Sequence, residues 1–194
     1  VAGAVSYGAL AALSRRVQAA LVARGIERGD RVGVLLSQSP LCAAAHIACW
    51  RMGAISVPLF KLFRGDALRS RLSDSGARVV ISDDEGAAML AGFDLSVITE
   101  LPSEGTAAEA VDTTPDDPAI VIYTSGTTGK PKGALHGHRV LIGHLPGVEM
   151  SHDFLGQPGD VLWTPADWAW IGGLFDVLMP GLAIGVPVVA ARMR

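Results

Sequence analysis

Cysteine is scarce in this sequence, and its two cysteines are poorly spaced for a disulfide. Cys42 and Cys49 lie seven residues apart in a segment that we expect to be helical. Seven residues of helix rise about 10 Å, which is too far for a disulfide within one straight helix. We therefore interpret both as buried core thiols and expect a cytoplasmic location, where thiols stay reduced.

Long apolar runs and an excess of positive charge are also missing. No stretch reaches the roughly 18 uninterrupted apolar residues of a membrane-spanning helix, so we expect no membrane span. The net charge is −3, with both signs mixed along 194 residues, which argues against nucleic acid as a partner and against a polybasic membrane patch. Apolar residues still make up 49% of the chain, enough for a sizeable core.

Helix and strand signals alternate along the first hundred residues. We expect helices over 6–24, 40–52, 65–75 and 84–91, and strands over 31–36, 54–59, 79–81 and 95–98. Ser6 and Ser39 are suitable N-caps, and Gly76 is a suitable helix end. This alternation predicts an α/β fold with mostly parallel sheets flanked by helices.

The segment 102–118 differs from its surroundings, because it is acidic, rich in Thr, Pro and Ala, and without periodicity. We interpret it as a linker between two partial α/β subdomains, 1–101 and 119–194. In the second part we expect strands over 119–123, 134–135, 161–163 and 186–190, with helices from Arg139 and over 168–179. The apolar run near the end needs neighbours to be buried, so we expect further sequence beyond both ends.

A glycine-rich segment follows the expected buried strand that ends at Tyr123. Its residues are Thr124, Ser125, Gly126, Thr127, Thr128, Gly129, Lys130, Pro131, Lys132 and Gly133. Glycines let the backbone approach a ligand closely, and exposed N–H groups and hydroxyls can then surround phosphate oxygens. With two lysines added, the segment indicates a polyphosphate-binding loop, and the alternative is a flexible surface turn.

This segment is not a nucleoside triphosphatase P-loop. That motif needs four residues between its glycines and a Ser or Thr after its Lys. Here two residues separate Gly126 from Gly129, and Pro131 follows Lys130. The spacing excludes the P-loop motif.

Residues Tyr123 to Gly133 resemble the phosphate-binding signature of the AMP-dependent synthetase and ligase superfamily. That superfamily includes acyl-CoA synthetases, luciferases and the adenylation domains of peptide synthetases. The resemblance continues through Gly29-Asp30-Arg31-Val32, Gly53-Ala54 to Pro58, and Asp74-Ser75-Gly76-Ala77, so it covers nearly the whole chain in order. It implies an incomplete acyl-CoA synthetase N-terminal domain, built from two α/β subdomains.

The resemblance also implies a reaction. Members of the superfamily join ATP and a small carboxylic acid into an acyl-adenylate and release pyrophosphate, and many then transfer the acyl group to coenzyme A. By this match, the residues from Thr124 to Lys130, together with Lys132, would surround the ATP phosphates, and Thr124 would help to bind Mg²⁺. Because the leaving pyrophosphate gathers negative charge, positioning and charge neutralisation by this loop would be its contribution to catalysis. Lys132 and His136, the histidine nearest the loop, are the candidate catalytic residues.

The segment from Thr164 to Gly173 is the second informative stretch. It resembles the Asp-x-Gly-Trp region of acetyl- and medium-chain acyl-CoA synthetases, with Ala169 in place of the usual Gly. By that match Trp170, Ile171 and Gly172 would border an acyl pocket. The alternative is that the tryptophans are ordinary core residues.

The remaining polar clusters have simpler interpretations. Four histidines follow the loop: His136, His138, His144 and His152. Since no cysteine or carboxylate completes a zinc-binding pattern, we interpret them as helix or loop histidines without a metal. Asp83-Asp84-Glu85 is typical of a helix N-terminus, which favours negative charge.

Later motifs of the superfamily are absent from the sequence, including the segments for adenine and ribose and the C-terminal lid with its catalytic lysine. We therefore expect the 194-residue chain to be inactive alone and to depend on a missing C-terminal lid of the same polypeptide. Two alternatives stay open, namely an aryl- or amino-acid-adenylating domain and a non-catalytic nucleotide-binding module. The acid used and the oligomeric state are not determined by the sequence.

Overall fold

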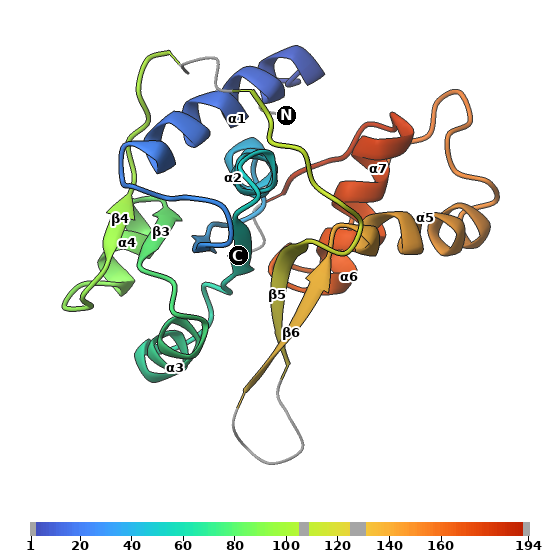
Figure 1. The fold of residues 1–194 in the computed structure, drawn as a ribbon. Helices are drawn as coiled ribbons and strands as arrows, with labels where there is room; N and C mark the ends of the chain where they lie inside the picture. Colours follow the sequence, from blue (N-terminus) through green and yellow to red (C-terminus); the bar gives the residue numbers. More distant parts are fainter. Residues whose placement is uncertain (1–2, 105–108, 125–130, 192–194) are drawn as a thin grey trace.

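The computed structural model describes residues 3–104, 109–124 and 131–191 (Figure 1). The helices are α1 (Tyr7–Val22), α2 (Pro40–Arg51), α3 (Gly65–Ser75), α4 (Asp84–Met89), α5 (Arg139–Ser151), α6 (Ile171–Gly173) and α7 (Met179–Ile184), with a π-helical turn (Leu174–Leu178) between the last two. The strands are β1 (Arg31–Leu35), β2 (Ile55–Pro58), β3 (Val79–Ser82), β4 (Ser96–Ile98), β5 (Pro118–Thr124) and β6 (Lys132–Gly137). In the described part of the chain, no helix is both long and apolar enough to cross a membrane.

These strands form one sheet in the order β4-β3-β1-β2-β5-β6. Every neighbouring pair from β4 to β5 is parallel, and only β5 and β6 are antiparallel. The predicted α/β class, with a mostly parallel sheet flanked by helices, is therefore confirmed.

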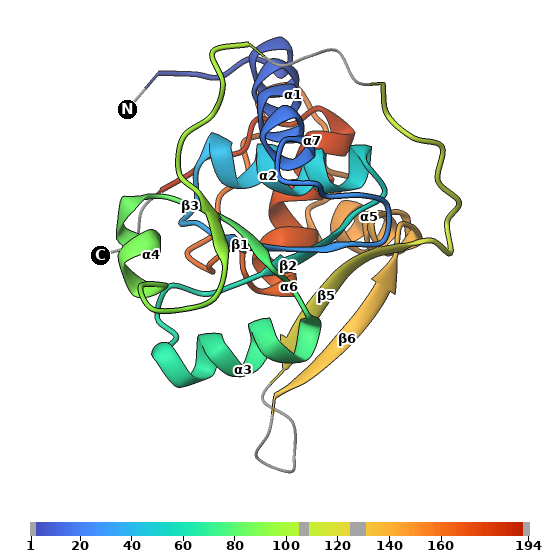
Figure 2. The same ribbon diagram turned by 60° about the vertical axis from the view of Figure 1, so that its left-hand side comes forward.

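Helices cover both faces of the sheet. On one face, a hydrophobic core joins α1, α2 and the residues from Trp168 to Met179 to the strands. On the other face, a second core joins α3 and α4 to the opposite sides of the same strands. Figure 2 shows α2 lying between α1 and the sheet, with α3 on the other side. Because both faces are covered, β2 and β3 are buried along their whole length, as is typical of parallel strands.

The expected helix boundaries follow from local hydrogen bonds. Ser6 accepts a hydrogen bond from the backbone N–H of Ala9, and Ser39 accepts one from Cys42, so both are N-caps. Gly76 ends α3 with φ of 68°, a left-handed conformation that glycine adopts without strain. Cys42 and Cys49 are buried and not bonded to each other, as expected of core thiols.

The final third of the chain differs from the expectation in two places. The expected strands over 161–163 and 186–190 are wrong, because only an isolated parallel bridge joins Leu162 to Val188. Pro187 has no N–H to donate, and the Val161 and Trp163 side chains are more than half exposed, so a longer ladder does not form here. The helix expected over 168–179 instead begins at Ile171 and continues to Ile184.

The expected linker lies against the rest of the chain at its described residues. The backbone N–H of Val111 donates to the carbonyl of Arg51, and Arg28 donates to the carbonyl of Asp112 over 2.9 Å. Past this segment, β5 pairs with β2, so strands from both sides of residues 102–118 share one sheet. The division of the chain into subdomains 1–101 and 119–194 stays a prediction.

Candidate functional site

Several polar and aromatic side chains meet at the carboxyl edge of the parallel strands. Since β1 to β5 all run in the same direction, the segments that follow them leave from this one edge. Open α/β sheets bind their ligands in the crevice at this edge. Phe60 and Lys61 follow β2, Asp83 follows β3, and Thr124 ends β5. The edge is therefore the candidate site.

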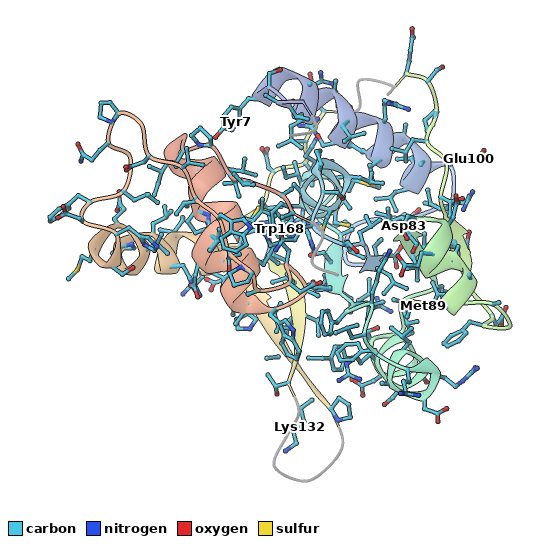
Figure 3. All side chains as sticks on the ribbon, turned by 180° about the vertical axis from the view of Figure 1, so that it is seen from behind. Tyr7, Asp83, Met89, Glu100, Lys132 and Trp168 are labelled. Carbon is cyan, nitrogen blue, oxygen red and sulfur yellow. The ribbon has the colours of Figure 1, made fainter. Side chains whose placement is uncertain are left out.

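The ends of the predicted phosphate loop lie at the tip of a β-hairpin. Thr124 is paired with Lys132 across β5 and β6, and both residues are exposed. Figure 3 shows Lys132 at the far end of the hairpin, well away from the buried Trp168. The other predicted phosphate ligands, Ser125, Gly126, Thr127, Thr128, Gly129 and Lys130, lie outside the described residues. The structure thus places the two ends of the loop at the candidate site.

At position 133, the last glycine of the motif, a side chain is excluded by steric contacts. A Cβ at this position would lie 2.7 Å from Cγ1 of Val121 and 3.1 Å from Cζ of Tyr123. Such contacts are too short for a side chain, so glycine lets β6 lie close against β5. This glycine serves the pairing of the two strands that carry the loop.

Helix α3 is tied to the strand that leads into the loop. The Tyr123 hydroxyl donates a 2.6 Å hydrogen bond to Oδ2 of Asp74. Burial, together with this carboxylate, raises the pKa of Tyr123, so the phenol stays protonated and remains a donor. The guanidinium carbon of Arg71, one turn before Asp74, lies 3.8 Å from the ring centroid of Phe63 and 5.8 Å from that of Tyr123. Burial lowers the pKa of Arg71.

Trp170 belongs to an aromatic cluster on this edge. Its ring centroid lies 5.9 Å from that of Phe60 and 6.4 Å from that of Phe63, and 39% of Trp170 is exposed. Trp168, by contrast, is only 2% exposed and packs in the core. The interpretation as a core residue therefore holds for Trp168, whereas Trp170 lies at the candidate site.

The two glycines after Trp170 differ in their surroundings. At Gly172 an added Cβ would meet only Oδ2 of Asp176, at an ordinary 3.5 Å, whereas at Gly173 it would lie 2.4 Å from the carbonyl oxygen of Asp167. Gly173 is therefore needed for packing, and Gly172 leaves space. Ile171, the third predicted pocket residue, is half-buried at the start of α6.

His136, the second candidate catalytic residue, lies on β6 opposite Ile120. It is four residues from Lys132, a separation of about 13 Å along a strand, and the two-residue period places both on the same side. His144 instead pairs with Asp176, its Nδ1 lying 2.7 Å from Oδ1. In the described part of the chain, no three His, Cys, Asp or Glu side chains form a group that could hold a metal ion.

Lys61 was not singled out by the sequence, yet it is the most enclosed ion-pairing group of this edge. Its Nζ lies 2.7 Å from Oδ2 of Asp83 and 2.8 Å from Oε2 of Glu85, and only 9% of its side chain is exposed. Asp83 also caps α4 through the N–H of Gly86, which confirms the helix N-terminus expected there. No pattern around Lys61 predicts the pairing, because it depends on how the segment after β2 lies against the start of α4.

Asp167 connects the Lys61 group to the segment that carries Trp170. Burial raises the pKa of Asp167, whereas a hydrogen bond from the N–H of Ala169 and the charge of Lys61 lower it. Asp167 accepts that bond through Oδ1 over 2.7 Å. The bond fixes the turn that carries Trp170, and Asp167 lies near enough to Lys61 for the lysine charge to act on its carboxylate.

A mostly parallel α/β sheet with these groups at its carboxyl edge is the architecture of many nucleotide-binding proteins. The family model described as AMP-binding enzyme matches residues 2–193. The chain therefore belongs to the AMP-binding enzyme family.

Individual relatives agree with this assignment. An acetyl-coenzyme A synthetase of Halorhodospira halophila is 34% identical, over 88% of this chain and 32% of its own length. Among solved structures, a Brucella canis acyl-CoA synthetase superposes with a TM-score of 0.84 at 29% identity, covering 96% of this chain and 37% of that one. An ATP-bound MatB from Rhodopseudomonas palustris gives 0.82 at 28% identity, covering 96% and 40%. The chain thus spans about a third of the length of the curated relatives it matches.

Proposed function

We propose that this chain is the ATP-binding and acid-binding part of an AMP-forming acid–CoA ligase. The whole protein would activate a carboxylic acid as an acyl-adenylate and transfer the acyl group to coenzyme A. The observation that carries this proposal is the place of the motif: both described ends of the Thr124–Lys132 segment lie at the carboxyl edge, together with the Trp170 cluster. The relatives named acetyl-coenzyme A synthetase favour a short acid.

In the proposed reaction, the substrate carboxylate attacks the α-phosphorus of ATP and pyrophosphate leaves. Residues Thr124 to Lys130 and Lys132 would hold the β- and γ-phosphates, and the Lys132 ammonium would offset the charge that gathers on the leaving group. His136 remains the second proposed catalytic residue. Because it lies about 13 Å from Lys132 along β6, it would act on another part of the substrates.

Magnesium would supply further charge neutralisation when bound. Mg²⁺ in nucleotide sites usually takes one or two protein oxygens and completes its shell with phosphates and water. The exposed hydroxyl of Thr124 can provide one such oxygen, and within the described residues no cluster of carboxylates adds to it. These residues therefore fit a Mg²⁺ ion that is bound mainly by the nucleotide phosphates and enters the site with them.

The acid is proposed to lie beside Trp170, Ile171 and Gly172. The ring of Trp170 is partly exposed and packs against Phe60 and Phe63, which makes an apolar surface, and Gly172 leaves room next to it. Coenzyme A would then be the acceptor. The cytosol, the expected compartment, is favoured by the unpaired thiols of Cys42 and Cys49.

The test is ATP–pyrophosphate exchange by the full-length protein that carries this chain, with a panel of acids. We expect exchange that depends on a short aliphatic acid, and a thioester when coenzyme A is added. Preference for an aryl or amino acid would favour the adenylating-domain alternative, and nucleotide binding without exchange would favour a non-catalytic module. We expect the 194-residue chain alone to bind nucleotide without turnover, and turnover by it would contradict its dependence on a C-terminal lid.

A further inference from the structure

Helix α3 holds the end of β5 through one partly buried hydrogen bond. Tyr123 is 5% exposed, and its hydroxyl is bonded to Asp74, which lies 49 residues earlier in the chain. Tyr123 directly precedes Thr124, the last residue of β5. A hydrogen bond to a carboxylate is short and strong, so this contact ties the end of β5 to α3. Figure 2 shows α3 beside the β5–β6 hairpin.

Arg71 is an unusual neighbour for this contact. It is 7% exposed, its Nη1 donates to the carbonyl of Ala67, and its Nε has no hydrogen-bond partner. Among the residues that the structure describes, no carboxylate lies within ion-pair distance of it. The charge is instead placed over the rings of Phe63 and Tyr123. Burying a donor that has no partner is costly. Attaching α3 to β5 does not require such a donor, since the bond between Asp74 and Tyr123 already does so.

The same arginine connects two parts of the site. Phe63, on which Arg71 stacks, contacts Trp170 with an interplanar angle of 77°, and Phe60 contacts both of these rings. A continuous series of contacts therefore leads from Trp170 through Phe63 and Arg71 to Tyr123. The aromatic cluster proposed for the acid and the strand proposed to carry the phosphate loop share one support on α3.

We propose that Arg71 and Asp74 are positioning residues, which set the end of β5 relative to the Trp170 cluster and so align ATP with the acid. This inference rests on the function proposed above. Neither residue touches substrate: Asp74 acts through Tyr123, and Arg71 acts through Tyr123 and Phe63. A geometric support of this kind changes kinetic constants, whereas a purely structural one changes only the amount of folded protein.

The first experiment removes the hydroxyl group of Tyr123 in the full-length protein. Tyr123→Phe keeps the ring and loses the bond to Asp74, and we expect kcat/KM for ATP in acid-dependent pyrophosphate exchange to fall about tenfold, since small misplacements at a reacting centre are costly. Tyr7→Phe is the matched control, because Tyr7 also donates its hydroxyl, over 2.9 Å, to the carbonyl of Leu182. The control is expected to retain wild-type kinetic constants.

The second experiment separates position from stability. Asp74→Asn keeps an oxygen acceptor for Tyr123 and is expected to retain most activity, whereas Asp74→Ala should match Tyr123→Phe. The double variant Asp74→Ala/Tyr123→Phe should be no worse than either single one, because both break the same bond. Arg71→Met, which keeps the apolar stem, should raise KM for ATP and for the acid together. Melting temperatures are measured for each variant.

Two results would overturn the inference. One is wild-type kcat/KM for ATP in Tyr123→Phe. The other is a loss of rate that follows the folded fraction, with both KM values unchanged in Tyr123→Phe and Arg71→Met. A wild-type protein that shows no acid-dependent exchange would overturn the proposed function, and this inference with it. If the wild type shows exchange and the variants have the same kinetic constants as the wild type, only the inference is overturned.

Discussion

Thr124 lies directly opposite Lys132 in the antiparallel pairing of β5 with β6. The pair stands at the end of the hairpin from which the predicted phosphate loop extends, and both side chains are exposed to solvent. Under the proposed function, a lysine whose backbone is held here by strand pairing would already lie near the phosphates, as electrostatic stabilisation of a leaving group requires.

Lys132→Ala should therefore weaken the handling of triphosphate more than that of AMP. We expect KM for ATP to rise about tenfold in the full-length protein, the size of effect that corresponds to loss of one charged hydrogen bond. Inhibition by AMP should change little, because AMP lacks the β- and γ-phosphates. Lys132→Arg keeps the charge and serves as the control. Equal losses for ATP and AMP would place the loop on another part of the nucleotide.

Gly133→Ala should destabilise the protein through the hairpin. The new Cβ would press against Val121 and Tyr123, and overpacking of this kind costs about 1–3 kcal/mol of unfolding free energy. Gly143→Ala on α5 is the matched control, because its Cβ would meet no atom within 4 Å. We expect that variant to be neutral or slightly stabilising. Urea denaturation measures both, and equal stability of the two variants would show that β6 can move away from β5.

Substitutions at Lys61 and Glu85 measure how much the ion pairs at the carboxyl edge contribute to stability. Lys61→Met removes a mostly enclosed cation and leaves Asp83 without that partner, so we expect a loss of about 1–3 kcal/mol of unfolding free energy. Glu85→Gln breaks only the pair whose carboxylate side chain is 70% exposed, and its cost should be below about 1 kcal/mol. Chemical denaturation at neutral pH compares them. A larger loss in Glu85→Gln would contradict the ranking by burial.

His46 should make stability depend on pH. It is 1% exposed, its Nδ1 has no hydrogen-bond partner, and burial lowers its pKa from 6.5 to about 3. Between these values the unfolded chain binds a proton that the folded protein does not, so stability is full above pH 6.5 and is lost as pH falls toward 3. The slope from this one group approaches about 1.4 kcal/mol per pH unit.

The variant His46→Leu isolates this contribution, because the carboxyl groups that also titrate in acid are left unchanged. We expect its unfolding free energy, measured by urea denaturation from pH 7 to pH 4, to fall less steeply than that of the wild type. Parallel curves would show that His46 finds a proton acceptor or water in the folded protein.

Features that depend on near neighbours in the chain could be predicted before the structure was known. Ser6, Ser39 and Gly76 bound their helices through hydrogen bonds and backbone angles that lie within a few residues, so their roles could be predicted. The motif predicted to bind phosphate could be recognised for the same reason, because its glycines, hydroxyls and lysines are contiguous. The family that this motif indicated is the one that the chain belongs to.

Contacts between distant segments could not be predicted, because they depend on how the whole chain folds. The bond between Tyr123 and Asp74 and the contact of Trp170 with Phe63 join parts of the chain that have no common local pattern. They arise because the strand order brings β5 next to β2, and this places α3, the loop after β2 and the start of α6 around one edge. The expected strands near Leu162 and Val188 failed for the related reason that a strand needs partners, and the apolar sequence does not show whether partners are present.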